Sequence, residues 1–529
     1  MADLAVQGIG AVCVGIYPTS PETEVAYLLD HSGAVVLIAE DEEQVDKAMA
    51  VRATLASLRT IVVMDTRGVD MTDPQLMSFE ELEALGFDAT TESFAREVAA
   101  VDPADTAVIV YTSGTTGPPK GAMITHANLI AATQSASAQF SVTPHDEVLS
   151  YLPLCHIAER LISVINAVGV GYTVNFGEGG ESFITDLQEV QPTFFLGVPR
   201  VWEKQMAGVE IRMADASRTK QWIYRSQMKR GAKLAQSRMQ GGLGAGGKVG
   251  YFIGWLLLYR SVRKKLGLLR VREALSGAAP ISPQVLEWFW ALGVPVREGY
   301  GQTENTAQAT ITPIDDVRIG KVGKAVPGSE VRIAGDGEIL TRGPGTFAGY
   351  FNDPVATAET VDADGWLHTG DVGELDDDGF LTITDRMKDI IITAGGKNVS
   401  PSEIENKLKV SPYIREAIVI GDQRKYLTAL IGIEGDTVGN WASRRDLMFT
   451  TYADLSSKSE VVELIRTAVD EANAELAQVE TIKAFRLLPK ELDQEDGEVT
   501  ATQKVKRRAI ATEFQALIES MYEGGTTSA

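Results

Sequence analysis

Short apolar runs alternate with longer amphipathic segments over most of this chain, and that alternation constrains the possible folds strongly. Near the start, "AVCVG", "AVVLIA" and "TIVVMD" are typical of buried strands, and "EDEEQVDKAMAVRATLASL" between the last two is typical of a helix. Because parallel strands need a crossover between them, strands that alternate with helices predict an α/β fold with largely parallel sheets. The first such strand begins within a dozen residues of Met1.

The pattern of the sequence changes after Asp385. "DIIITAGGKNVSPSEIENKLK" predicts a strand, a glycine turn and a helix that begins at Ser400, and "AIVIGD" and "TALIGIEG" predict two more strands. At ~150 residues per domain, 529 residues correspond to two to four domains. We therefore predict a large α/β domain of stacked, mainly parallel sheets with helices over residues 1–384. A smaller α+β domain over residues 385–529 is expected to follow on a hinge.

Charge is distributed unevenly along the chain. The formal net charge is −23, which disfavours a nucleic acid as partner. Between Ile211 and Arg272, however, there are fifteen Lys and Arg residues and a single acid, Asp215. This basic block indicates an anionic partner, such as a membrane surface or a phosphorylated cofactor, or else a solvated helical face.

The longest apolar run, "VGYFIGWLLLY" (Val249–Tyr259), lies inside this block. It is too short to span a bilayer, which takes ~20 residues. We interpret it as a buried helix, with a helix lying in a membrane surface as the alternative. The two cysteines, Cys13 and Cys155, form no disulfide framework, and Met1 to Ser20 lacks the basic start of a signal peptide. We therefore expect a cytoplasmic protein, with peripheral contact at the inner membrane face as a further possibility through residues 211–272.

The stretch "YTSGTTGPPKGAMITH" (Tyr111–His126) connects two apolar strands through a loop suited to phosphate. Glycines let backbone amides turn toward an anion, hydroxyls add donors, and a lysine adds positive charge. The loop differs from the P-loop of ATPases, because Pro119 precedes its lysine and Gly121 follows it. The residues expected to bind phosphate are Thr112, Ser113, Gly114, Thr115, Thr116, Gly117 and Lys120.

This loop resembles the phosphate-binding loop of the adenylate-forming enzymes, which include acyl-CoA synthetases, luciferases and peptide-synthetase adenylation domains. Further segments resemble that family in the family's order, so that the resemblance covers nearly the whole chain. It implies ATP, Mg²⁺ and CoA as cofactor and co-substrates. The segments are "SGAAPIS" (Ser276–Ser282), "REGYGQTE" (Arg297–Glu304), "GWLHTGDVG" (Gly365–Gly373), "DRMKD" (Asp385–Asp389) and "TATQKVKRR" (Thr500–Arg508).

The resemblance implies roles for particular residues in binding ATP. Gly277 and Ala278 would line the adenine pocket, and Tyr300 would stack on the base. Thr303 would bind the α-phosphate, and Asp371 would accept the ribose hydroxyls. A carboxylate suits two neighbouring hydroxyls because it is an acceptor with two oxygens. The expected Mg²⁺ ligands are Thr116 and Glu304, since hydroxyl and carboxylate oxygens suit a hard cation.

A second group of implied roles concerns the smaller domain. Asp385 would be the pivot of the hinge, and Arg386 would reach ribose and phosphate. Lys504 aligns with the lysine that catalyses adenylation in the family. Lys506, in the same basic run, is the alternative for this role. Gly395 and Gly396 would let the pantetheine arm of CoA pass close to backbone after a rotation about the hinge.

Two segments bear on the acid that is activated. "LPLCHIAERLIS" (Leu152–Ser163) and "FFLGVPRVWEK" (Phe194–Lys204) resemble long-chain acyl-CoA synthetases, especially the very-long-chain bubblegum branch. The resemblance implies a long-chain fatty acid as substrate, converted to acyl-AMP and pyrophosphate, and then to acyl-CoA and AMP. His156 and Glu159 are expected near the acyl pocket, with a structural hydrogen-bonded pair as the alternative for both.

Other functions remain to be weighed against this ligase. A fatty acyl-AMP ligase would share most of the motifs. Relatives carry a further strand-and-helix subdomain before "GAVCVGIYPTSP", so the chain looks truncated at its N-terminus and could be an inactive nucleotide- or acyl-binding remnant. A membrane-docking scaffold built on the basic block would leave the nucleotide motifs unexplained. We favour the ligase because every catalytic motif of the family is intact in this sequence.

Overall fold

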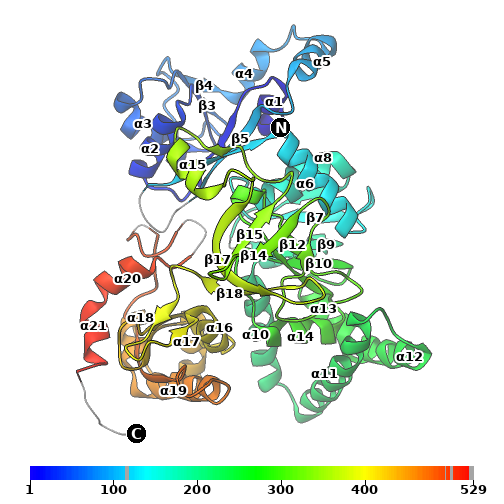
Figure 1. Cartoon of the computed structure of the whole chain (residues 1–529), viewed down its shortest axis with the longest axis vertical. Coiled ribbons are helices and arrows are strands. Elements are labelled where there is room, and N and C mark those ends of the chain that lie inside the picture. Colours follow the sequence, from blue (N-terminus) through cyan, green and yellow to red (C-terminus); the bar gives the residue numbers. More distant parts are fainter. Residues whose placement is uncertain (113–117, 181, 495, 501–503, 524–529) are drawn as a thin grey trace.

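The computed structural model describes residues 1–112, 118–180, 182–494, 496–500 and 504–523. Figure 1 shows a large part that holds most of the chain and a smaller part, in yellow, orange and red, that holds its C-terminal segment. The α/β fold expected from the sequence is confirmed, with parallel pairing in several sheets and antiparallel pairing in others. Five expected phosphate-loop residues lie outside the described residues: Ser113, Gly114, Thr115, Thr116 and Gly117.

The first apolar runs form the strands that their patterns predict. Strands β2, β3 and β4 pair in parallel in that order, and α3 forms the predicted connection between β2 and β3. The Asp41 side chain caps α3 by accepting the Gln44 N–H at 3.1 Å. A helix that the sequence did not predict, α1, precedes the first strand. These elements are α1 (Ala2–Gly8), β1 (Cys13–Gly15), α2 (Glu22–Ser32), β2 (Val36–Ala39), α3 (Glu42–Val51), β3 (Thr60–Val63), β4 (Leu76–Ser78), α4 (Phe79–Leu85) and α5 (Thr91–Ala100).

The expected phosphate loop is the connection of an antiparallel hairpin. Strands β5 and β6 pair so that Thr112 faces Lys120, and this sheet has the order β1-β5-β6-β16. A side chain of α2 holds the end of the loop, because the Tyr27 hydroxyl donates to the Pro119 carbonyl at 3.0 Å. The elements are β5 (Thr106–Thr112), β6 (Lys120–Thr125), α6 (His126–Gln139) and β16 (Gly349–Tyr350).

A five-stranded sheet of order β13-β12-β11-β10-β9 forms the middle of the large part. Its strands β9, β10 and β11 are parallel, and β12 and β13 add to one edge in antiparallel fashion. Beside it, β7 and β8 pair in parallel. The strands are β7 (Glu147–Ser150), β8 (Thr173–Phe176), β9 (Phe194–Gly197), β10 (Glu273–Ser276), β11 (Val296–Tyr300), β12 (Thr310–Ile311) and β13 (Lys324–Ala325). The helices are α7 (Ile157–Arg160), α8 (Asn166–Val170), α9 (Phe183–Val190), α10 (Pro199–Ala214) and α14 (Pro283–Leu292).

An antiparallel sheet of order β14-β15-β17-β18 leads from this part toward the smaller one. The connections from β14 to β15 and from β17 to β18 are short turns, and they cannot carry the crossover that parallel pairing needs. Its elements, with the helix before β17, are β14 (Glu330–Ile333), β15 (Glu338–Arg342), α15 (Pro354–Thr360), β17 (Leu367–Leu375) and β18 (Leu381–Arg386).

The smaller part has its own apolar core. Its buried clusters begin at Ile391, whereas those of the large part end at Leu381. The predicted strand, turn and helix are confirmed, and Ser400 caps α16 through the Glu403 N–H. The strands are β19 (Ile391–Ile392), β20 (Asn398–Val399), β21 (Ile414–Ile420), β22 (Leu427–Ile433) and β23 (Ile482–Leu487). The helices are α16 (Pro401–Leu408), α17 (Gly435–Ser443), α18 (Tyr452–Ser457), α19 (Ser459–Asn473), α20 (Arg507–Glu513) and α21 (Gln515–Ser520).

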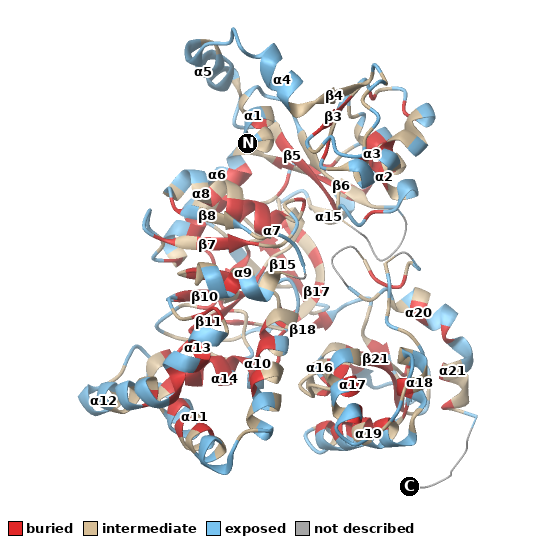
Figure 2. Ribbon diagram, turned by 180° about the vertical axis from the view of Figure 1, so that it is seen from behind, coloured by how far each residue is buried: buried red, intermediate tan, exposed pale blue. Residues whose placement is uncertain are grey.

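The prediction of a buried helix over Val249–Tyr259 is wrong for one of its faces. The run lies in α12 (Ala245–Gly254) and the π-helical turn η3 (Trp255–Tyr259), which pack against α11 (Arg218–Met239) and lead into α13 (Arg260–Lys265). Leu258 and Tyr259 are buried, but much of the opposite face is exposed because α11 and α12 project from the large part (Figure 2). Within the described ranges, no helix is long and apolar enough to cross a bilayer.

Candidate functional site

Arg386 at the hinge forms an ion pair with Asp371 of the large part, and Lys504 of the C-terminal segment lies near enough for its charge to interact with both of them and with Glu304. Lys504 has an exposed side chain, yet desolvation by the surrounding protein and the charge of Arg386 lower the pKa of its ammonium. The carboxylates of Asp371 and Glu304 act on the same ammonium in the opposite direction. The structure therefore brings together predicted residues from the large part, the hinge and the C-terminal segment. Lys504 is the lysine that the alignment favoured over Lys506.

Asp371 on β17 is the most highly connected carboxylate of the cluster. It is buried, and its Oδ2 accepts the Tyr300 hydroxyl and the Gln302 side-chain amide, each at 2.7 Å. Its Oδ1 lies 3.2 Å from the Arg386 Nε. The same Gln302 amide also donates to the Thr369 carbonyl at 2.8 Å. Gln302 was not predicted as a site residue, although it lies within the quoted motif.

The segment after β11 turns tightly at Gly301. A Cβ at this position would lie 2.2 Å from the Ala307 carbonyl carbon, so only glycine allows this close approach. Ala307 and Thr306 both have positive φ, at 60° and 54°, which is strained for residues with a side chain. This turn holds Thr303 and Glu304 in a short 3₁₀ helix next to the end of β11.

Gly277 and Ala278 follow β10 and lie beside the end of β11. Ser276 pairs with Glu298, and a Cβ on Gly277 would lie 3.3 Å from the Gly299 carbonyl oxygen. Ala278 has a φ of 70°, an unusual value for alanine. Sequence reasoning missed Glu298, whose burial raises its pKa to about 8 although the Gly320 N–H donates to it. It stands in the strand Val296–Tyr300 beside Arg297, two residues before the predicted adenine-stacking tyrosine, and only its burial sets it apart.

The described edge of the phosphate loop joins the charged cluster through Tyr350. The Lys120 ammonium lies 5.2 Å from the centre of the Tyr350 ring, and the Tyr350 hydroxyl donates to Glu304 Oε1 at 2.7 Å. Thr112 lies across the hairpin, with its hydroxyl 3.5 Å from the Lys120 carbonyl oxygen.

The surroundings of Glu304 fit a magnesium ion that is bound together with phosphate. In the described portion of the chain, no group of three or more His, Cys, Asp or Glu residues is placed to hold a metal. Mg²⁺ is commonly held by one or two carboxylates together with substrate phosphates and water. A single carboxylate next to a phosphate-type loop matches that chemistry.

Asp385, the predicted hinge residue, is buried at the end of β18 and is bonded to the start of α16. Its carboxylate accepts the Ser400 hydroxyl at 2.7 Å, the Ser402 N–H at 3.0 Å and the Ser402 hydroxyl at 2.9 Å. Its neighbour Arg386 instead contacts Asp371 in the large part. Asp385 is thus bonded to the smaller part and Arg386 to the large part. Any rotation of one part relative to the other would strain or break one of these two sets of contacts.

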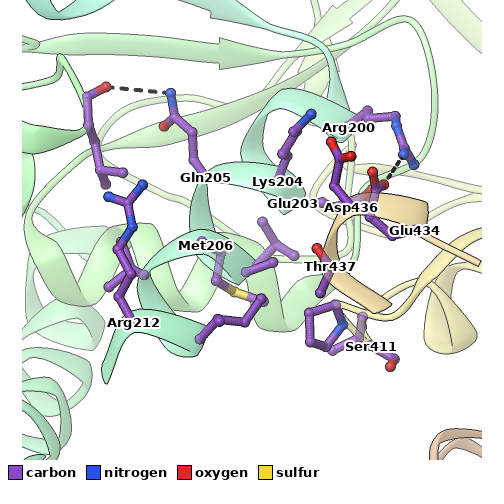
Figure 3. Close-up of a pocket in the computed structure, with 18 of the residues that line it drawn as sticks. Arg200, Glu203, Lys204, Gln205, Met206, Arg212, Ser411, Glu434, Asp436 and Thr437 are labelled. Carbon is purple, nitrogen blue, oxygen red and sulfur yellow. Dashed lines mark hydrogen bonds and ion pairs between the residues drawn. The ribbon is translucent and has the colours of Figure 1, made fainter. Parts of the chain in front are cut away.

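Further ion pairs join the two parts away from the hinge. Arg200 of α10 lies 2.5 Å from Glu434 and donates to the Arg415 carbonyl at 2.8 Å. Figure 3 shows the Arg200 side chain bonded to Glu434 at one edge of a pocket that elements of both parts line. Asp215 pairs with Arg444 of the smaller part. These contacts exist in the arrangement that brings Lys504 to the cluster.

His156 and Glu159 do not form the hydrogen-bonded pair that was one alternative for them. The His156 Nδ1 accepts the Ala158 N–H at 3.3 Å, whereas Glu159 is buried and accepts the Ser163 hydroxyl at 2.6 Å. Burial raises the pKa of Glu159. Burial, and next the charge of Lys504, lower the pKa of His156 to about 4. His156 therefore lies near the charged cluster and is neutral at pH 7.

The low pKa of His156 predicts an acid-dependent loss of stability. Unfolded histidine binds a proton near pH 6.5, whereas the folded ring does so only near pH 4. The unfolded state therefore binds more protons between these values, and the free energy of unfolding falls as the pH falls. By pH 5 this loss of unfolding free energy amounts to about 2 kcal/mol, and His156→Gln should remove it.

Denaturant unfolding of the wild type and the variant at pH 7 and pH 5 measures the difference. Parallel pH dependence in wild type and variant would contradict the assignment, and His145→Gln at the surface is the control.

Gly395 and Gly396 lie in an exposed turn between β19 and β20. Gly396 has a φ of 73°, and its N–H donates to the Thr393 carbonyl at 2.8 Å. No hydrogen bond or ion pair between described residues joins this turn to the charged cluster. The charged cluster therefore includes Lys504, Glu304, Asp371 and Arg386 but not the two glycines expected beside the thiol.

Family models match this chain over most of its length. The model for AMP-binding enzymes matches residues 1–351, and the model for the AMP-binding enzyme C-terminal domain matches residues 388–526. The chain belongs to the AMP-binding enzyme family, which confirms the resemblance to adenylate-forming enzymes.

Among its relatives, the chain is 35% identical over 523 residues to the long-chain-fatty-acid–CoA ligase FadD15 of Mycobacterium bovis, covering 98% of this chain and 85% of that protein. It is 40% identical over 429 residues to the putative fatty-acid–CoA ligase fadD11 of Mycobacterium tuberculosis, covering 80% and 74% of the two chains. It is 31% identical to the long-chain-fatty-acid–CoA ligase ACSBG2 of Xenopus laevis, covering 100% and 75%.

Solved structures support the fold. The adenylation domain of a carboxylic acid reductase from Segniliparus rugosus, in complex with AMP and a co-purified carboxylic acid, superposes with a TM-score of 0.72 at 21% identity. The similarity covers 98% of this chain and 80% of that one. At this level of identity it is the architecture that is shared.

Proposed function

We propose that this protein is an ATP-dependent long-chain fatty acid–CoA ligase. The observation that carries the proposal is the Arg386–Asp371 ion pair at the hinge, with Lys504 and Glu304 near enough to interact with it through their charges. Membership of the AMP-binding family supports it, and the relatives that are named long-chain-fatty-acid–CoA ligases support the choice of acid.

In the first half-reaction, a carboxylate oxygen bonds to the α-phosphorus of ATP, and the bond from that phosphorus to the bridging oxygen of pyrophosphate breaks. Lys504, Lys120 and Arg386 provide positive charge for the crowded phosphorus and the leaving group, and they act by preorganised electrostatics rather than by covalent catalysis. Thr303 binds the α-phosphate, with the loop residues 112–117 on the other phosphates. When Mg²⁺ is bound, with Glu304 and Thr116 as its protein ligands, it neutralises further charge on these oxygens.

The nucleoside is held by the groups around Asp371. Its carboxylate accepts the ribose hydroxyls, while Tyr300 stacks on adenine between Gly277, Ala278 and the end of β11. His156 and Glu159 lie toward the acyl side. Because His156 is neutral at pH 7 and its Nδ1 is occupied by the Ala158 N–H, its free Nε2 carries the proton and can donate to an acyl oxygen.

In the second half-reaction, the CoA thiol loses its proton to solvent and its sulfur bonds to the acyl carbon, while the bond from that carbon to the phosphate oxygen breaks and AMP leaves. We propose that the part from residue 385 onward rotates about Asp385, which withdraws Lys504 and brings Gly395 and Gly396 to the pantetheine arm. The separate cores of residues 1–384 and 385–529 support this division into domains. The ion pairs of Arg200 and Asp215 would break in that rotation.

The partners that follow are small molecules: ATP, CoA and a long-chain fatty acid. We place the reaction in the cytoplasm, where ATP and CoA are available and where Cys13 and Cys155 stay free, as the structure has them. A water-insoluble substrate also favours peripheral contact with the inner membrane face through residues 211–272.

The proposal is tested by incubating the purified protein with ATP, Mg²⁺ and palmitate, with and without CoA, and following nucleotides and acyl products by mass spectrometry. AMP and palmitoyl-CoA are expected, both abolished by chelation of Mg²⁺. Palmitoyl-AMP that never passes to CoA would instead indicate a fatty acyl-AMP ligase. A folded protein that makes no AMP with any of several acids would contradict the proposal and favour an inactive remnant.

A further inference from the structure

Five large apolar side chains form one exposed stripe on the helix that runs through α12 and η3. Their spacing of three and four residues places them on a single helical face. Each is more than two-fifths exposed, and a stripe of this kind is uncommon on a soluble surface unless it serves binding. The stripe consists of Val249 (61% exposed), Phe252 (58%), Ile253 (41%), Leu256 (62%) and Leu257 (55%).

The stripe is not the side by which this helix joins the protein. The opposite face, with Leu258 and Tyr259, is buried in the core beneath α11 and α14, and the Tyr259 hydroxyl donates to the Gln227 carbonyl at 2.7 Å. The helix is thus apolar on two faces but covered on only one. Figure 2 shows α12, coloured mostly as exposed, at the outer end of the projection that it forms with α11.

Cations continue the stripe where the apolar residues end. Arg260 and Lys264 follow at the same helical spacing, and Lys248 precedes it; all three are exposed. Within the part of the chain that the structure describes, none of the three has a carboxylate within ion-pair distance. The surrounding segment from Ile211 to Arg272 is strongly basic, although the protein as a whole is acidic. The occupant must therefore be apolar where it meets the stripe and anionic beside it.

A bilayer containing anionic lipid satisfies both demands. Acyl chains accept the apolar side chains, while neighbouring headgroups accept the cations, as for amphipathic helices that lie in the membrane interface. A second copy of the chain fits less well, because symmetric contact between two stripes would bring two sets of unpaired cations together.

We propose that residues 248–264 form a docking surface by which this protein inserts the 249–257 stripe into the interface of an anionic bilayer. The inference deepens the proposed function, on which its purpose rests, because a long-chain fatty acid partitions into bilayers and is taken up there. The protein docks reversibly, since one short helical face buries too little apolar surface for permanent anchoring.

The test is co-sedimentation of the full chain with phosphatidylcholine vesicles, with and without phosphatidylglycerol, at low and high salt. Binding is expected to need phosphatidylglycerol and to weaken with salt. Phe252→Ser/Leu256→Ser should lower partitioning by at least about tenfold. Arg260→Gln/Lys264→Gln should lower it about fivefold for each cation at low salt.

The matched control is Leu85→Ser/Phe87→Ser at the other end of the molecule. These side chains are also highly exposed, at 73% and 89%, but they are surrounded by acids such as Glu83 and Asp88. This variant should bind vesicles as the wild type does. Absence of vesicle binding by wild-type protein, or equal loss in stripe and control variants, would overturn the proposal.

Two further readouts separate the possible failures. Stripe variants should ligate a dissolved short-chain acid at the wild-type rate but lose use of palmitate carried in vesicles. If the wild type binds vesicles but makes no acyl-CoA, the ligase proposal fails and the docking surface stands. If sedimentation equilibrium shows dimers that the stripe substitutions dissociate, and vesicles do not bind, the stripe belongs to a second copy and docking is refuted.

Discussion

Replacing Lys504 with alanine is expected to slow formation of acyl-AMP by roughly 100- to 1000-fold while leaving transfer from acyl-AMP to CoA nearly intact. The side chain lies where the charges of Glu304 and Asp371 reach its ammonium. Those carboxylates do not bond it tightly, so it is available to the negative charge that develops on phosphate. The loss should therefore fall on kcat of the first half-reaction rather than on folding.

The measurement uses two assays on the same preparation. Pyrophosphate release from ATP and palmitate reports adenylation, and acyl-CoA formation from synthetic palmitoyl-AMP reports the second step. Lys506→Ala is the matched control, because it removes the same group two residues away, at the residue before α20. Equal loss in both half-reactions, or a larger effect of Lys506→Ala, would refute the assignment of Lys504.

Asp371→Ala is expected to weaken ATP binding by at least about 100-fold, with kcat affected less. The buried carboxylate accepts the Tyr300 hydroxyl and the Gln302 amide and faces Arg386. Its removal leaves these donors without their acceptor, and it also removes the proposed partner of the ribose hydroxyls. Tyr300→Phe keeps the aromatic ring but deletes one hydrogen bond, so its effect should stay near about tenfold.

Comparing two proteins with two nucleotides separates the contact of Asp371 with the ribose from its hydrogen bonds to neighbouring side chains. Isothermal titration of wild type and Asp371→Ala is repeated with 2′,3′-dideoxy-ATP in place of ATP. If the carboxylate holds the ribose, the wild type loses affinity for the analogue, whereas the variant discriminates little between the two nucleotides. Similar discrimination by both proteins would show that Asp371 only positions its neighbours.

Local patterns predicted a large share of the fold. The two strands beside the phosphate loop, the first parallel strands and the helix capped by Ser400 all depend on residues close in sequence, and all are present. The antiparallel sheet before the hinge was not predicted from the sequence. Its strand pairing depends on the lengths of the connections and not on the hydrophobic period. The exposed stripe was also missed, since periodicity shows that a helix is apolar but not which face is covered.

For the site, the motifs identified most of the residues but not their connections. Glu304, Asp371, Arg386 and Lys504 were found in the sequence, whereas Gln302, Tyr350 and Glu298 were found only through their contacts. The latter three are ordinary polar residues in the sequence. Their roles depend on partners far away along the chain.

The sequence by itself determined the family, the order of the phosphate, nucleotide and hinge segments, and the α/β character, because motif spacing and hydrophobic period are local properties. The tertiary structure alone decided that His156 and Glu159 bond to separate partners. It also decided that the stripe on α12 faces outward. The physical reason is the same in each case: charge interaction, desolvation and burial depend on which distant segments fold against one another.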